Sequence, residues 1–144
     1  MIARSRMLLP LLLACGCIVG CGGVARDDSG TIMPQAIPPI QDVPVPVGFR
    51  YVDKASLDAS SHGVRTIVHT YSGPVDKFET KRFFRSQMSQ SGWGVTSDIS
   101  FKGVQTLMFV KNNETCRIMI TDGGLLGGSR VEVQIHPNIP LKGK

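Results

Sequence analysis

The chain has 144 residues, a formal net charge of +5 and hydrophobic residues at 42% of its positions. Two of the positive charges, Arg4 and Arg6, precede an apolar N-terminal stretch; without them the net charge is +3, which is ordinary for a soluble domain. The domain is poor in aromatic residues interleaved with basic ones, which argues against nucleic-acid binding, and the length leaves room for one small globular domain.

The first twenty residues have the pattern of a secretory signal peptide. Arg4 and Arg6 are followed by an uncharged, mostly apolar stretch over residues 7–19, the order of segments that directs export. A permanent membrane-spanning helix takes roughly 17 to 25 apolar residues, so this stretch is too short to be one. We therefore expect residues 1–20 to be a signal peptide that is removed.

Residues 18–21, Ile-Val-Gly-Cys, resemble the lipobox of bacterial lipoproteins. The resemblance implies cleavage before Cys21, a diacylglyceryl thioether on its sulfur and an acyl chain such as palmitate on its amine. Two or more acyl chains anchor a protein firmly to a membrane. The resemblance also places the protein in the cell envelope. Gly22 after the cysteine resembles an outer-membrane signal in bacteria with two membranes.

Two other cleavage sites remain open. Residues 12–15, Leu-Leu-Ala-Cys, also fit a lipobox and would make Cys15 the modified residue, but they leave an apolar core of only about eight residues. Residues 23–25, Gly-Val-Ala, fit an ordinary signal peptidase. We prefer Cys21 because it leaves a signal of normal length.

Residues 21–47 are expected to form a tether behind the lipidated cysteine. This stretch contains five prolines, which oppose a helix or a central strand. It would span roughly 30 Å as a random coil and up to about 80 Å if its Pro-rich part is extended. It could also be a polyproline ligand for a partner.

Residues 48–137 are expected to form one α+β domain, in which a single helix packs on a mostly antiparallel sheet in the order ββαββββ. Residues 138–144 form a tail. The polar residues 57–63 are expected to be a loop, and Gly92 is expected to end the helix. The predicted helix covers residues 75–91, and the predicted strands cover residues 49–56, 64–71, 93–100, 105–111, 114–121 and 129–136.

Two surfaces are candidate contacts for a partner. On a helical wheel the predicted helix has an apolar side that should face the sheet and a basic side formed by Lys77, Lys81, Arg82 and Arg85. The basic side is either a solvated face or a contact for anionic lipid or an acidic partner. In the glycine-rich loop 122–129, Leu125 and Leu126 either bind a partner or cover the edge of the sheet.

The domain also resembles a group of small exported bacterial domains of uncharacterised role. The resemblance covers most of residues 44–121 and implies a fold without implying a reaction. It is carried by turn and core positions: Pro44-x-Pro46-x-Gly48-Phe49, Tyr71-x-Gly73, Met88-x-x-x-Gly92-Trp93 and Leu107-x-Phe109-x-Lys111.

No pattern in the sequence indicates catalysis, a metal or a cofactor. The histidines His62, His69 and His136 are too far apart to suggest a metal site, and Cys116 is expected to be a buried apolar residue on a strand. We therefore expect a non-enzymatic domain that binds or scaffolds another envelope protein. The alternative is a small-ligand cavity between helix and sheet, lined by Phe84, Met88, Trp93 and Phe109. A spatial cluster of His69, His136 or Cys116 with an acid would favour an enzyme.

Overall fold

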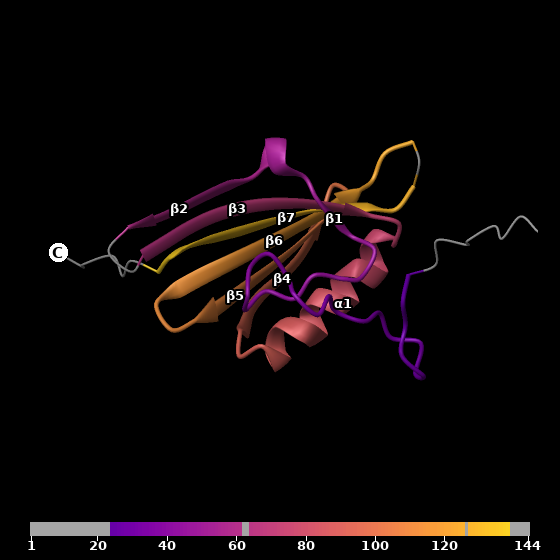
Figure 1. Ribbon diagram of the computed structural model, residues 1–144, viewed down its shortest axis with the longest axis horizontal. Helices are drawn as coiled ribbons and strands as arrows, with labels where there is room; N and C mark the ends of the chain where they lie inside the picture. The colour runs from indigo at the N-terminus through magenta and orange to yellow at the C-terminus, as the bar shows by residue number, and fades with distance from the viewer. Residues whose placement is uncertain (1–23, 62–63, 126, 139–144) are drawn as a thin grey trace, which may run out of the picture.

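The computed structural model describes residues 24–61, 64–125 and 127–138, coloured in Figure 1. The predictions for the signal peptide, Cys15, Cys21, His62, Leu126 and residues 139–144 lie outside this part of the chain.

The fold is α+β, with one helix packed on an antiparallel sheet, as the sequence predicts. The sheet order is β1-β3-β7-β6-β5-β4, and β2 pairs with β3 beside β1. All pairings among the described residues are antiparallel. The elements are β1 (Arg50–Tyr51), a 3-10 turn (Asp53–Ala55), β2 (Leu57–Ser61), β3 (Val64–Gly73), α1 (Lys77–Gln90), β4 (Gly94–Phe101), β5 (Val104–Lys111), β6 (Glu114–Asp122) and β7 (Ser129–Pro137).

The sheet has one strand more than expected before the helix. Residues 57–61, predicted as a loop, form β2, which pairs with β3 from Leu57 opposite Val68 to Ser61 opposite Val64. The predicted strand 49–56 is split into β1 and the 3-10 turn. All five residues of β2 are exposed, so the strand has no buried side chains to produce an alternating apolar pattern.

Helix α1 covers part of one face of the sheet, beneath β4, β5 and β6 in Figure 1. Asp76 caps its start, since the Asp76 carboxylate accepts hydrogen bonds from the backbone N–H groups of Phe78 and Glu79. Gly92 follows its end with a φ of +85°, the left-handed conformation expected there. The buried helix residues are Thr80, Phe83, Phe84 and Met88, on the side predicted to face the sheet.

Residues 24–49, which we call the N-terminal cover, pack against the same face beside α1 (Figure 1). Five of its apolar side chains are at most 5% exposed: Ile32, Ile40, Val43, Val45 and Phe49. The cover folds back on itself, because Gln35 N–H donates to the Val45 carbonyl at 2.8 Å and Val47 N–H donates to that of Met33 at 2.9 Å. The phenyl ring of Phe49 packs over Gly73, where a Cβ would stand only 2.3 Å from the ring.

The expectation of a free tether over residues 21–47 is therefore corrected for its described part, residues 24–47. Its apolar residues belong to the same core cluster as the residues of the sheet and helix. One helix leaves part of a broad sheet face uncovered, and burial of these side chains removes that apolar surface from water. The prolines exclude a helix here, but they are compatible with an extended chain packed on a sheet.

Candidate functional site

The predicted cavity between helix and sheet is filled by side chains. Phe84, Met88, Trp93 and Phe109 are each at most 1% exposed and belong to one core cluster. None of them lines either of the two hollows described below. The small-ligand prediction is therefore wrong in its location, because these four residues form packed core.

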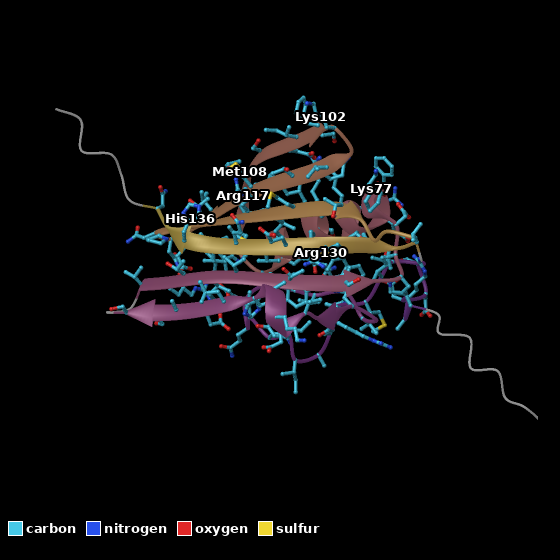
Figure 2. The ribbon with its side chains drawn as sticks, turned by 90° about the horizontal axis from the view of Figure 1, so that it is seen from above. Lys77, Lys102, Met108, Arg117, Arg130 and His136 are labelled. Atoms are coloured by element: carbon cyan, nitrogen blue, oxygen red, sulfur yellow. The ribbon has the colours of Figure 1, made fainter. Side chains whose placement is uncertain are left out.

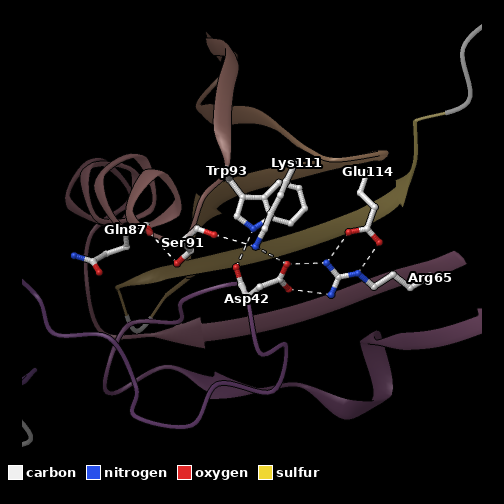
Figure 3. A network of polar contacts seen from close by, with 7 residues as sticks. All are labelled: Asp42, Arg65, Gln87, Ser91, Trp93, Lys111 and Glu114. Atoms are coloured by element: carbon white, nitrogen blue, oxygen red, sulfur yellow. Dashed lines mark hydrogen bonds and ion pairs between the residues drawn. The ribbon is translucent and has the colours of Figure 1, made fainter. Parts of the chain in front are cut away.

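A polar network fastens the N-terminal cover to the sheet (Figure 3). The Arg65 guanidinium on β3 donates to both carboxylate oxygens of Asp42, at 2.9 and 2.8 Å, and to both of Glu114, at 2.7 Å each. Lys111 Nζ adds an ion pair to Asp42 at 3.2 Å. Trp93 Nε1 donates to the Asp42 backbone carbonyl at 2.9 Å. We call these residues the Arg65 clamp.

Burial and ion pairing act in opposite directions on the pKa values of the clamp residues. Burial opposes ionisation of Asp42, but the hydrogen bonds and charges of Arg65 and Lys111 outweigh it and hold the pKa of its carboxyl below the ordinary value. Hydrogen bonds to Glu114 and Asp42 raise the pKa of Arg65. All three members of the Asp42–Arg65–Glu114 set are about three-quarters buried, so the clamp gives up much of its hydration for these contacts.

A second cluster joins His69 to an acid and a phenol. His69 is 3% exposed; its Nε2 lies 2.8 Å from Asp58 Oδ2, and its Nδ1 lies 2.9 Å from the Tyr71 hydroxyl. The Tyr51 ring packs edge-on over the imidazole at 4.7 Å. Burial raises the pKa of Tyr71, so its phenol stays protonated near neutral pH. The sequence singled out His69 but not Asp58, because Asp58 lies in the segment predicted as a loop.

Cys116 and His136 take no part in that cluster. Cys116 is 0% exposed, as predicted, and burial raises the pKa of its thiol to about 12, which keeps it unreactive. His136 is exposed at the end of β7, and its Nδ1 lies 3.3 Å from the Pro137 carbonyl. The two residues lie on neighbouring strands but do not form a site.

Three of the four cations predicted to form a contact surface on α1 have partners within the chain. Lys77 pairs with Asp122 at 2.7 Å, and both Lys81 and Arg85 pair with Asp98, at 2.5 and 2.7 Å. The fourth cation, Arg82, is exposed and lines a hollow of about 320 Å³ between α1 and the cover. Much of the basic charge on this helix face is therefore neutralised by the end of β6 and by β4.

The loop between β6 and β7 presents Leu125 to solvent. Gly123 N–H donates to the Gly128 carbonyl at 3.0 Å, and Gly127 N–H donates to that of Gly124 at 3.1 Å, so the loop closes on itself. Leu125 at its tip is 108% exposed. It does not cover the sheet edge, and it remains available as a contact.

A further hollow lies where the cover meets β1 and the end of β3. Its volume is about 710 Å³. It combines apolar walls with one cation and one hydroxyl, and it is lined by Val24, Gly48, Phe49, Arg50, Val52, Ser72, Gly73 and Pro74. A concave, mostly apolar site with few polar groups is typical of small-molecule binding. We call it the β1–β3 hollow.

Within the described ranges, no helix is long and apolar enough to cross a membrane, and no group of three or more His, Cys, Asp or Glu side chains is placed to bind a metal ion.

Comparison with curated proteins and with solved structures gives no match. A family model described as START domain-like matches residues 53–137, more than half of the chain. The match spans the sheet from β2 to β7 together with α1 and leaves the N-terminal cover outside. The chain therefore belongs to the START domain-like family.

Proposed function

We propose that the protein is an exported envelope protein, anchored through acylated Cys21, whose domain binds a small and largely apolar molecule without transforming it. The observation that carries the binding function is the β1–β3 hollow in a START domain-like fold. Its volume of about 710 Å³ lies within the range of roughly 300 to 1,000 Å³ found for small-molecule sites.

The walls of the hollow indicate the chemistry of the ligand. Val24, Phe49, Val52 and Pro74 offer apolar surface, while Arg50 supplies a positive charge. A molecule with an apolar body and one anionic group satisfies both parts, because a guanidinium binds carboxylates, phosphates and sulfonates through paired hydrogen bonds.

His69 and Asp58 form the pair of a histidine with an acid that would favour an enzyme, but the burial of the cluster supports a binding role over catalysis. His69 and Tyr71 are at most 3% exposed, so a substrate has little access to either. Both imidazole nitrogens already have partners, in Asp58 and Tyr71. The contact of His69 with Asp58 holds β2 on β3, and the burial of His69 and Tyr71 keeps both side chains away from a reacting group.

The ligand site is tested with the probe 1-anilinonaphthalene-8-sulfonate, an aromatic sulfonate that becomes fluorescent in apolar surroundings. The Ser72→Trp substitution fills the hollow and is expected to abolish probe binding, and Arg50→Ala is expected to weaken it about tenfold. Ser89→Trp, on the exposed side of α1, is the matched control. Equal binding by wild type, Ser72→Trp and Arg50→Ala would rule out the hollow as the site.

The anchor is tested by mass spectrometry of the N-terminal peptide from membranes. We expect a peptide that begins at Cys21 and carries the mass of a diacylglyceryl group plus an acyl chain. In the Cys21→Ala variant this mass should be absent and the protein should leave the membrane fraction. An acylated peptide that begins at Cys15 would show that Cys15 is the lipidated residue. An unmodified N-terminus would show that the protein has no lipid anchor.

A further inference from the structure

Three large apolar side chains are exposed at one end of the domain, and each comes from a different element. Phe78 in the first turn of α1 is 57% exposed, Phe101 at the end of β4 is 66% exposed, and Leu125 in the β6–β7 loop is 108% exposed. Exposed apolar residues gathered on one surface mark a contact with another molecule or a membrane. We call this surface the apolar end.

Contacts around Lys77 show that the three elements meet there. The Lys77 ammonium lies 2.7 Å from Asp122 Oδ2, at the end of β6, and 5.5 Å from the centre of the Phe78 ring. It also lies 3.9 Å from where a Cβ would stand on Gly103, in the β4–β5 turn. In Figure 2, Lys77 and Lys102 lie toward the same end of the sheet, and His136 lies toward the other.

The described chain also begins at the apolar end. Val24 and Pro74 both lie within 4 Å of where a Cβ would stand on Gly48, and Pro74 lies three residues before Lys77, the first residue of α1. The Cα of Pro74 also lies 3.0 Å from where a Cβ would stand on Gly128, the last glycine of the β6–β7 loop. Figure 1 shows the indigo start of the chain on the same side as this loop.

The other end of the described chain lies across the sheet. Asn138 N–H donates to the Asn113 carbonyl in the β5–β6 turn at 2.6 Å. Strand β6 leads from that turn to Asp122 over nine residues, a distance of roughly 27 Å. Labels at the two ends of the sheet therefore report on well-separated surfaces.

We propose that the apolar end docks on the lipid bilayer, with Phe78, Phe101 and Leu125 entering the interface between headgroups and acyl chains. The inference rests on the anchor proposed above: Cys21 precedes Val24 by three residues, which span at most about 11 Å. A lipidated Cys21 holds Val24, at the same end of the domain, within that distance of the membrane, which leaves little room there for an intervening protein partner. The short segment between Cys21 and Val24 therefore favours the bilayer as the surface that the apolar end contacts.

The side chains around the three tips suit a membrane interface. Lys102 Nζ lies 5.3 Å from the Phe101 ring centre, so its charged head and apolar stem sit beside the ring, as in residues that reach from the acyl boundary to the headgroups. The carboxylate of Asp122 is held by Lys77, so it does not oppose a negatively charged bilayer as a free charge.

The test places a fluorescent label on single cysteines of the full chain in phosphatidylethanolamine–phosphatidylglycerol vesicles. Phe101→Cys and Leu125→Cys mark the apolar end, and Asn113→Cys marks the opposite end. Cys116 does not compete for the label because it is buried and its thiol pKa is raised. We expect lipids brominated near the headgroup to quench labels at 101 and 125 and to leave the label at 113 unquenched.

The proposal would be overturned if the labels at 101, 125 and 113 were equally exposed to water and none was quenched by the brominated lipids. The acylation state of Cys21, measured by mass on the same sample, is a separate result: if the anchor is missing, the same labels are read after vesicles are added to the Cys21→Ser chain, in which residue 21 offers no second thiol for the label. In that form Phe101→Ser with Leu125→Ser should lower vesicle binding about tenfold or more. Ile37→Ser, which removes an exposed apolar residue (90%) of the N-terminal cover, should leave binding unchanged, and an equal loss in both variants would also overturn the proposal.

Discussion

The Val45→Asp variant is expected to lower the free energy of unfolding by about 3 to 5 kcal/mol, because it places an unpaired carboxylate in the core. Val45 is 0% exposed and lies in the N-terminal cover, outside the segment matched by the family model. A free tether would tolerate the change. Urea unfolding, followed by the fluorescence of Trp93, the chain's one tryptophan, measures the effect.

The matched control is Ile37→Asp. Ile37 belongs to the same cover but is 90% exposed, so the same charge should change the free energy of unfolding by less than about 0.5 kcal/mol. Unfolding midpoints that agree for the wild type and both variants would show that the cover is not part of the cooperative domain.

Arg65→Ala is the second substitution with a large expected effect, a loss of about 2 to 3 kcal/mol at neutral pH. It leaves Asp42 and Glu114, both about three-quarters buried, without the cation that lies between them. Lys111 keeps one contact to Asp42, which limits the loss. Arg65→Lys should retain part of the stability, since an ammonium cannot bind both carboxylates in the bidentate geometry of a guanidinium.

The effect of Arg65→Ala should shrink as the pH falls. The pKa of Asp42 is lower in the folded protein than its ordinary value, so its contribution is complete above the unfolded pKa of about 4 and is lost as the pH falls through the folded value. Unfolding curves of wild type and variant at pH 7 and near pH 3 measure this. A difference that stays constant over that range would mean that the Asp42 pair does not stabilise the fold.

The elements that alternate cleanly in the sequence are the ones that prediction located best. Strand β7 buries Val131, Val133 and Ile135, and its predicted bounds differ from the observed ones by one residue. Strand β2 was missed because its side chains are all exposed and backbone pairing with β3 holds it. The sequence therefore placed Asp58 in a loop and His69 in a strand, and it gave no sign that the two side chains are in contact.

The N-terminal cover was misread for a different reason. Its prolines are typical of a spacer, but Val43 and Val45 alternate with Pro44 and Pro46, and all four are buried. The composition of a segment shows which regular structures it cannot form. Whether the segment is buried depends on whether another part of the fold leaves apolar surface for it to cover. Asp42, the partner of Arg65, lies in that segment, so the clamp was invisible to any motif search.

The predicted contact residues differ in whether they remain available to a partner. Leu125 is fully exposed, whereas Lys77, Lys81 and Arg85 form ion pairs with acids that lie 45, 17 and 13 residues further along the chain. Such pairs depend on tertiary structure and leave no local pattern in the sequence.

The pairing of β3 with β7 has a consequence for the order of folding. Strands β4 to β7 each pair with their neighbour in sequence, whereas Ile67 of β3 lies opposite Ile135 of β7. Local hairpins close faster than distant pairs, because a longer loop costs more entropy to close. Strands β4 to β7 can pair through local hairpins, whereas β3, and with it β1 and β2, joins the sheet only when β7 is available as a partner.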